Sequence, residues 1–214
     1  MKVKQLFILF ILISFTAFSQ TDNKAQEILK GLSSKYKSLK SLKANFSIVI
    51  ENQNDKSKQE QLGTLLLKGV KYKLQVAGQD IISDGKTRWT FVKDANEIQI
   101  DNQKKDENSI SPTNVFTIYE KGWLSKYTGE KKIKNIVYQN IELVPIDGKS
   151  KNIFKVKLTI DKSRKTISTA VIYDKNGSVQ TISVNKFTPD VANDDSLYIF
   201  KNSNYPGSEV VDLR

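Results

Sequence analysis

Carboxylate side chains that stand close together are the most obvious source of acid–base chemistry in this sequence. A pair of carboxylates can serve as general acid and as nucleophile or base in glycoside hydrolysis. Three groups have suitable spacing: Asp80 with Asp84, Asp101 with Asp106 and Glu107, and Asp194 with Asp195. Each group lies in or beside a predicted turn, where Asp is favoured because its side chain accepts local backbone hydrogen bonds. We therefore interpret these carboxylates as turn residues.

A serine and a lysine also stand close together, at Ser83 and Lys86. A serine activated by a neighbouring base is a common nucleophile. The residues between them, Asp84-Gly85, are typical of the tip of a β-hairpin, which explains the same sequence without catalysis. The chain has no His and no Cys, which excludes a Ser-His-Asp triad, a thiol nucleophile, disulfides and the usual ligands of zinc, haem iron and copper. We predict a protein that is not an enzyme and needs no cofactor.

The net charge of +11 comes from 34 Lys plus Arg against 23 Asp plus Glu. Only Arg88, Arg164 and Arg214 are arginines, and the lysines are spread over the chain without a basic block. Base readout and bidentate phosphate contacts favour Arg. We therefore expect a dispersed, solvated lysine surface and no nucleic-acid partner. The charge leaves open an attraction to anionic lipid head groups or to an acidic partner.

The N-terminus has the parts of a secretory signal. Lys2 and Lys4 precede an apolar run from Leu6 to Phe15, and Ala17-Phe18-Ser19 offers small residues for cleavage. The run is shorter than the ~20 residues that a membrane-spanning helix needs. No Cys follows it, so we do not expect a lipid anchor on this protein. We predict that residues 1–19 are a cleaved signal peptide and that residues 20–214 form a single domain, soluble after export.

One predicted helix precedes a long series of predicted strands. Apolar residues recur at helical spacing from Ala25 to Leu39, which predicts a helix over residues 24–40 with Asp22 as its N-cap. From Leu42 to Ile50 the apolar residues alternate with polar ones, which predicts a half-buried strand. Further strands are predicted over residues 60–68, 70–77, 79–83, 86–93, 96–101, 123–128, 133–143, 152–161, 165–174, 178–187 and 196–201.

Short strands separated by hairpin turns, without intervening helices, predict one antiparallel sheet that is strongly curved or closed toward a barrel. The segment between Asn102 and Gly122 interrupts this pattern. Pro112 stands ahead of several apolar residues there, and Pro is tolerated in the first turn of a helix. We therefore predict a short helix over residues 112–121. The predicted fold class is mainly β with helices.

The predicted sheet has more apolar surface than one helix can cover. Several strands are apolar on both faces, as at Leu65 to Leu67, Ile81 to Ile82 and Ala170 to Ile172. Such a sheet encloses either a filled core or a ligand cavity. Periodicity does not measure volume, so both alternatives stay open at this point.

Six motifs follow the predicted helix in a characteristic order. They are Gly63-Thr-Leu-Leu-Leu-Lys68, Tyr72-Lys-Leu74, Ile82-Ser-Asp-Gly-Lys-Thr-Arg-Trp89, Ser111-Pro-Thr-Asn-Val-Phe116, Ile141-Glu-Leu-Val-Pro145, and Phe200 with Tyr205-Pro-Gly-Ser-Glu-Val-Val-Asp212. Their order and spacing resemble the LolA family of periplasmic outer-membrane lipoprotein carriers. The hairpin over residues 82–89 is the most specific of them, and the match covers nearly the whole chain after the signal peptide.

The resemblance implies an unclosed, strongly curved antiparallel β-barrel of about eleven strands with a helical lid. It implies a periplasmic carrier that shelters the acyl chains of acylated lipoproteins in an apolar cavity. We expect such a carrier to be a monomer, because the delivery of one hydrophobic load gains nothing from symmetry. The implied partners are an inner-membrane ATP-driven lipoprotein release complex and an outer-membrane acceptor protein or membrane. Tyr72 holds the place of an aromatic that meets the inner-membrane complex in the family.

One departure from the family concerns the lid. The family's best-known members carry Lys-Arg-Pro where this chain has Lys68-Gly69-Val70. The Arg ties the lid shut in those members, so we expect lid control to differ here.

Large apolar residues of the expected inner surface are the candidate lining of the acyl-chain cavity. Burial of one methylene group stabilises by ~0.8 kcal/mol, so the transfer of one long acyl chain from water into an apolar cavity is favourable by on the order of 10 kcal/mol. The assignment depends on strand register, because a shift of one residue turns every side chain over. The candidates are Phe46, Ile48, Leu65, Leu67, Tyr72, Leu74, Ile82, Trp89, Phe91, Ile98, Phe116 and Ile118.

Two alternatives accompany this prediction. The first is a LolA-like periplasmic protein that binds another lipid or an apolar small molecule. The second is a ligand-free interaction module whose β core is filled by its own side chains. Native mass spectrometry of protein taken from cells separates the first from a lipoprotein carrier, and an acyl probe that never enters the interior indicates the second.

Overall fold

The computed structural model describes residues 22–103, 110–149 and 151–214. The predicted signal peptide over residues 1–19 lies outside the described residues, as do Asp106 and Glu107. No helix within the described ranges is both long enough and apolar enough to cross a membrane.

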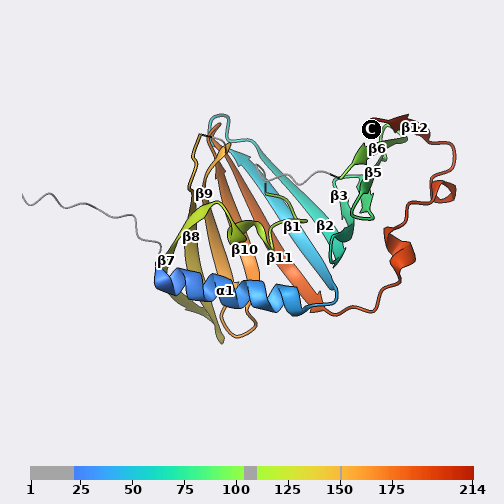
Figure 1. The fold of residues 1–214 in the computed structure, drawn as a ribbon. Helices are drawn as coiled ribbons and strands as arrows, with labels where there is room; N and C mark the ends of the chain where they lie inside the picture. The colour runs from blue at the N-terminus through green and yellow to red at the C-terminus, as the bar shows by residue number, and fades with distance from the viewer. Residues whose placement is uncertain (1–21, 104–109, 150) are drawn as a thin grey trace, which may run out of the picture.

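One curved sheet of twelve strands dominates the described chain, in the order β12-β6-β5-β4-β3-β2-β1-β11-β10-β9-β8-β7. The helix α1 (Asn23–Ser38) lies across the half formed by β7 to β11, and the β3 to β6 end turns away from it (Figure 1). The strands are β1 (Leu42–Asn52), β2 (Lys58–Lys68), β3 (Lys71–Val76), β4 (Gln79–Ser83), β5 (Thr87–Val92), β6 (Glu97–Asn102), β7 (Trp123–Ile133), β8 (Ile136–Pro145), β9 (Ile153–Asp161), β10 (Thr166–Asp174), β11 (Ser178–Pro189) and β12 (Glu209–Asp212).

The predicted fold class is confirmed. Every pair of neighbouring strands is antiparallel in the part of the sheet that runs from β6, through β1 and β11, to β7 at the far edge. The sheet is open rather than closed into a barrel. The predicted helix over residues 24–40 corresponds to α1, and its predicted N-cap is present at Asp22.

Asp22 connects α1 to the edge strand β7. One carboxylate oxygen accepts hydrogen bonds from the backbone N–H groups of Lys24 (2.9 Å) and Ala25 (3.4 Å), as an N-cap does. The other oxygen accepts from the N–H of Tyr127 (3.0 Å), and the N–H of Asp22 donates to the carbonyl of Ser125 (3.2 Å). The hydrogen bond from Tyr127 N–H lowers the pKa of Asp22 most, and those from Lys24 and Ala25 lower it further. The start of the helix is thereby attached to the sheet.

Tyr36 anchors the other end of α1 on the concave face. Its side chain is buried, and its hydroxyl oxygen accepts a hydrogen bond from the backbone N–H of Ile167 at 2.9 Å. The ring packs against Phe116 and Phe187, with centroids 5.0 and 5.8 Å away. Burial raises the pKa of Tyr36, so the phenol stays neutral. The buried face of α1 consists of Ala25, Leu29, Leu32 and Tyr36, and it closes the core over the sheet.

Two predicted strands have different bounds in the structure. The strands predicted over residues 123–128 and 133–143 form the longer hairpin β7–β8, whose turn contains Lys134 with φ of 54°. A β-bulge between Tyr127 and Gly129 interrupts the alternation of side chains, which is why the sequence pattern of β7 ends too early.

The strand predicted over residues 196–201 is wrong. Residues Asp195–Tyr198 form a 3-10 helix, η2, capped by the carboxylate of Asp194, which accepts a hydrogen bond from Ser196 N–H. The last strand is β12, and it pairs parallel with β6. Local capping outweighs the strand preference of the continuous apolar run from Leu197 to Phe200.

The short helix predicted over residues 112–121 is also wrong. These residues form turns followed by a 3-10 helix, η1 (Ile118–Glu120). The side-chain oxygen of Asn114 accepts from Ser111 N–H at 2.8 Å, and the Thr117 hydroxyl donates to the Asn114 carbonyl at 3.3 Å. Polar side chains that satisfy nearby backbone groups compete in this way with a regular helix. We call residues 110–120 the cover segment.

Gly63 in β2 leaves room for the ring of Phe46 in β1. A Cβ atom at position 63 would lie 2.3 Å from the Cζ atom of Phe46 and 2.8 Å from the backbone oxygen of Gln75. The two residues face each other in the β1–β2 register. Any side chain at Gly63 would therefore displace the aromatic ring or separate β2 from β3.

We expect Gly63→Ala to lower the free energy of unfolding by about 3 kcal/mol, because overpacking forces side chains and backbone apart. Gly31→Ala in α1 is the matched control. Its added Cβ meets nothing within 4 Å, and Ala favours a helix over Gly by ~1 kcal/mol, so it should stabilise the protein. Urea unfolding measures both changes. Equal stability of Gly63→Ala and the natural chain would contradict the packing described here.

Candidate functional site: the concave apolar face

Strand register defines which side chains share each face of the sheet. Leu65 of β2 pairs with Ala44 of β1 and with Leu74 of β3, so these three residues lie on one face. That face is the concave one, because Ala44 and Leu65 belong to the core beneath α1. Tyr72 lies on the same face and pairs with Leu67. The concave face is therefore apolar across β1 to β3.

The structure divides the twelve candidate lining residues between two faces. Six lie on the concave face: Phe46, Ile48, Leu65, Leu67, Tyr72 and Leu74. Two more, Phe116 and Ile118, belong to the cover segment that packs on that face. Four lie on the opposite face: Ile82, Trp89, Phe91 and Ile98.

Register explains the division. Ile82 pairs with Lys73 and with Trp89, whereas its neighbour Ile81 pairs with Leu74 of the concave face. Both isoleucines are apolar, so the sequence pattern does not identify the inward one. The twelve residues thus do not form one continuous surface, and a role in acyl-chain binding stays a prediction for those on the concave side.

Beneath the cover segment the concave face is filled by side chains. The gap among Phe46, Leu65, Val115 and Phe116 is too small to admit a water molecule. These four residues are at most 2% exposed. In this conformation the protein fills that part of its interior with its own core.

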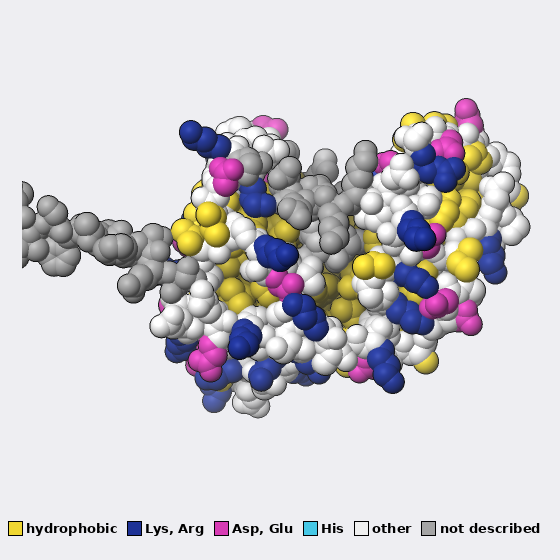
Figure 2. All heavy atoms as spheres, in the orientation of Figure 1, with side chains coloured by type: hydrophobic (Ala, Val, Ile, Leu, Met, Phe, Trp, Pro, Cys, Tyr) yellow, Lys and Arg dark blue, Asp and Glu magenta, His cyan; other side chains and the backbone are white. Residues whose placement is uncertain are grey.

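The concave face is more open at two places. Leu67, Val76 and Ile81 are half-buried at the edge of the core, where β2 to β4 turn away from α1. Figure 2 shows hydrophobic side chains in the hollow between the two halves of the molecule, with Lys and Arg side chains around it. This arrangement offers an apolar surface with a basic surround.

The second opening is a pocket of about 570 Å³ at the end of β9, β10 and β11. Its apolar walls are Ile110 of the cover segment, Ile153 and Ile172, and its rim includes Asn152 and Gln180. The volume falls within the roughly 300–1,000 Å³ of typical ligand pockets. Sequence reasoning predicted strands here but did not select these isoleucines, because the family-like motifs used for selection are concentrated before residue 120.

A polar row crosses the sheet beside Leu67. The Arg88 guanidinium lies 2.9 Å from the Asp101 carboxylate, and the Tyr72 hydroxyl donates to the side-chain oxygen of Gln103 at 3.0 Å. Burial raises the pKa of Tyr72, with the Arg88 charge acting in the opposite direction. The Nε atom of Arg88 is buried without a hydrogen-bond partner among the described residues. Tyr72 is 7% exposed, so it offers little surface to a protein partner in this conformation.

The acidic and nucleophilic candidates have structural partners. Asp84 accepts hydrogen bonds from the N–H groups of Lys86 and Thr87, both at 2.8 Å, as expected of a turn residue. Ser83 is buried, and its hydroxyl oxygen accepts from Gly85 N–H. Asp80 accepts from the side chains of Gln75 and Tyr205. These contacts give Asp80, Ser83 and Asp84 structural roles in the hairpin and its surroundings.

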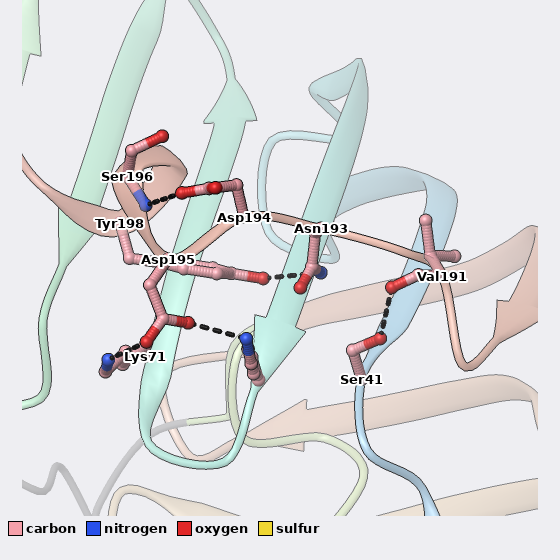
Figure 3. A network of polar contacts seen from close by, with 9 residues as sticks. Ser41, Lys71, Val191, Asn193, Asp194, Asp195, Ser196 and Tyr198 are labelled. Carbon is pink, nitrogen blue, oxygen red and sulfur yellow. Dashed lines mark hydrogen bonds and ion pairs between the residues drawn. The ribbon is translucent and has the colours of Figure 1, made fainter.

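The C-terminal strap, residues 190–214, covers the opposite face of β3 to β6. Phe200 stacks on Trp89 with ring centroids 5.9 Å apart, and Tyr205 lies 4.6 Å from Phe91. The Asp195 carboxylate pairs with Lys68 (2.6 Å) and Lys71 (2.9 Å), and Figure 3 shows this network. Tyr198 in the same strap is fully buried. Four predicted lining residues are therefore on the face that the protein's own C-terminus covers.

An open antiparallel barrel with an apolar concave face under one helix defines a class of fold suited to apolar ligands. Residues 37–201 match the family described as "Outer membrane lipoprotein carrier protein LolA", and the chain belongs to this family. A search of curated protein sequences finds no match to the chain.

Two solved structures are similar to this fold. An uncharacterized conserved protein from Thermus thermophilus has 14% sequence identity and a TM-score of 0.58, with 88% of this chain and 99% of that chain covered. Lipoprotein LppX from Mycobacterium tuberculosis has 14% identity and a TM-score of 0.50, with 81% of this chain and 100% of that chain covered. At these identities the likeness shows the fold alone.

We expect Asp195→Asn to loosen the C-terminal strap at neutral pH. Hydrogen bonds from Lys68 and then Lys71 lower the pKa of Asp195 to about 2 from an ordinary value of 3.8. Because the folded-state pKa is lowered, this attachment is fully present above about pH 4 and is lost as the pH falls toward 2. Limited proteolysis of residues 190–214 and Trp89 fluorescence in a Trp123→Phe background measure the loosening.

Asp212→Asn is the matched control for the strap. The pKa of Asp212 is also lowered to about 2, but its partner Arg214 is only two residues away. The substitution therefore removes an equivalent charge without removing a contact between strap and sheet. Equal loosening in both variants would show that the Asp195 pairs do not fasten the strap.

Proposed function

We propose that this protein is a periplasmic carrier that binds the acyl chains of lipoproteins and transfers them from the inner to the outer membrane. Membership of the LolA family carries this proposal, together with the half-buried apolar edge at Leu67, Val76 and Ile81. This edge is continuous with the core, so an acyl chain bound there can extend inward. The carrier hydrolyses nothing and needs no cofactor.

Loading requires the cover segment to give way, because the space beneath it is filled. An acyl chain brings on the order of 10 kcal/mol of hydrophobic free energy, enough to replace the contacts of a few side chains. Phe116 and Val115 are the side chains whose volume it would take. The pocket beside Ile110 adjoins the start of the same segment, so displacement there extends an existing opening.

Glu120 holds the end of the cover segment to α1. Its carboxylate pairs with Lys37 at 2.9 Å and accepts a hydrogen bond from the Ser33 hydroxyl. Partial burial works to raise the pKa of Glu120, but these bonds outweigh it and lower the pKa. Surface pairs of this kind are weak. We propose that they serve as the latch in place of the family's Arg, whose position is Gly69 here.

The expected partners follow from this function. Acylated lipoproteins are the cargo, an inner-membrane ATP-driven release complex supplies them, and an outer-membrane acceptor protein or membrane receives them. The carrier acts as a monomer, since one hydrophobic load needs one concave face. A related carrier for another lipid or apolar small molecule would use the same surface.

The filled interior favours a second candidate function. Phe46, Leu65 and Phe116 pack without a void that could hold water, as in a ligand-free interaction module. Such a protein would use its surfaces for partners and would never bind an acyl chain on the concave face.

We expect Leu67→Gln to weaken binding of a fluorescent acyl probe about tenfold, because the substitution puts an amide on the apolar concave edge. Leu66→Gln is the matched control: it is also half-buried, but it faces the opposite side, paired with Lys43 and Lys73. Probe titration with the purified chain measures both affinities. Equal probe affinities of the Leu67→Gln and Leu66→Gln variants, or no binding of the probe to the natural chain, would favour the interaction module.

Lipoprotein cargo needs a separate measurement. Purified protein incubated with membranes that contain an acylated lipoprotein should keep that lipoprotein soluble after the membranes are sedimented. A non-acylated form of the same lipoprotein is the control. Binding of the acyl probe without solubilisation of several lipoproteins would point to a carrier of other lipids.

A further inference from the structure

The outward face of β8 to β10 carries exposed apolar side chains beside lysines. Val144 is 41% exposed, Phe154 is 45% exposed, and Ile146, just after β8, is 65% exposed. The ring of Tyr173 lies 5.9 Å from that of Phe154. We call Val144, Ile146, Phe154, Tyr173, Lys155 and Lys157 the convex patch.

Register places the lysines of this patch on the side away from α1, and a register shift that leaves Phe154 without a partner in β10 turns its exposed ring to the same side, beside Tyr173. In β9, Val156 and Leu158 are buried in the core, so the alternating Lys155 and Lys157 face outward. Lys155 pairs with Tyr173 of β10. Lys157 lies between Glu142 of β8 and Val171 of β10. The lysines and the aromatic rings therefore form one surface.

The lysines of the patch lie over its rings. The Nζ atom of Lys155 is 4.9 Å from the ring centroid of Tyr173 and 5.7 Å from that of Phe154. The Nζ atom of Lys157 is 5.6 Å from the centroid of Tyr173. Within the described ranges neither lysine belongs to an ion pair with a carboxylate. Both ammonium groups thus lie close to the aromatic rings and stay available to an anion.

We propose that the convex patch docks the protein on the surface of an anionic membrane. Exposed apolar residues can enter the head-group region, aromatic rings favour the bilayer interface, and lysines attract anionic lipids. The convex patch presents apolar residues, aromatic rings and lysines on one surface. The two positive charges of its lysines exceed the single negative charge of the neighbouring Glu142. The docked face is opposite to the concave one, so a membrane-bound molecule keeps Leu67 and Val76 accessible to a ligand. This inference does not depend on which ligand that is.

The test uses the purified chain from residue 20 onward and vesicles of phosphatidylcholine with or without phosphatidylglycerol. We expect co-sedimentation with the anionic vesicles, reduced by added salt. The double substitution Lys155→Ala/Lys157→Ala should weaken that binding roughly 25-fold, at roughly fivefold for each lysine. Phe154→Ser should weaken it roughly fivefold by removing the exposed ring.

Matched controls lie at the far end of β7. Lys131→Ala/Lys132→Ala removes the same charge, and Ile133→Ser removes a side chain that is 48% exposed. Both should leave vesicle binding unchanged. Circular dichroism checks folding, and if Phe154→Ser does not fold, the two double-lysine variants decide the test, since their side chains are on the surface.

Three results would overturn the proposal. One is equal binding to neutral and anionic vesicles, and another is an equal loss in the control variants, which would indicate general charge attraction. The third is a dimer in light scattering that Phe154→Ser dissociates, because the patch would then be an interface between two copies. A failure of the acyl-probe experiment with normal vesicle binding would affect the proposed cargo alone.

Discussion

The architecture of this protein follows from one constraint: successive side chains of a strand point to opposite faces, and several of its strands are apolar on both. Ile81 and Ile82 illustrate the problem, since one faces the concave side and the other faces away. Both faces must therefore be kept from water. The helix α1 and the cover segment protect the concave face, and the C-terminal strap protects the opposite face of β3 to β6. On that face the rings of Phe200 and Tyr205 lie against Trp89 and Phe91.

Sequence patterns predicted the order of the elements well, because amphipathic periodicity reports local burial. The helix, its cap at Asp22 and most strands were recognisable for that reason. Patterns failed where a side chain competes for backbone groups, as Asn114 does in the cover segment and Asp194 does before η2. They also failed at the bulge near Gly129, where one extra residue changes the period.

The candidate site was only partly predictable for a different reason. Phe46, Leu65 and Leu74 could be placed on the inner face from strand alternation and their place in the family-like motifs. Trp89 and Phe91 could not be placed, since the residues that cover them arrive from more than 100 positions later in the chain. Ile110 and Ile172 were not selected because a pocket depends on where separate elements end, which no local pattern encodes.

The carboxylate of Asp22 has a consequence beyond the start of α1. An open sheet has two terminal strands, and their unpaired backbone groups can add strands from other molecules and start aggregation. At β7 the N–H of Tyr127 and the carbonyl of Ser125 are both bonded to Asp22. At the other end the short strand β12 lies along β6. At β7 the bonds of Asp22 thus remove one donor and one acceptor that an incoming strand could otherwise pair with, and at the other end the sheet ends with a strand of only four residues.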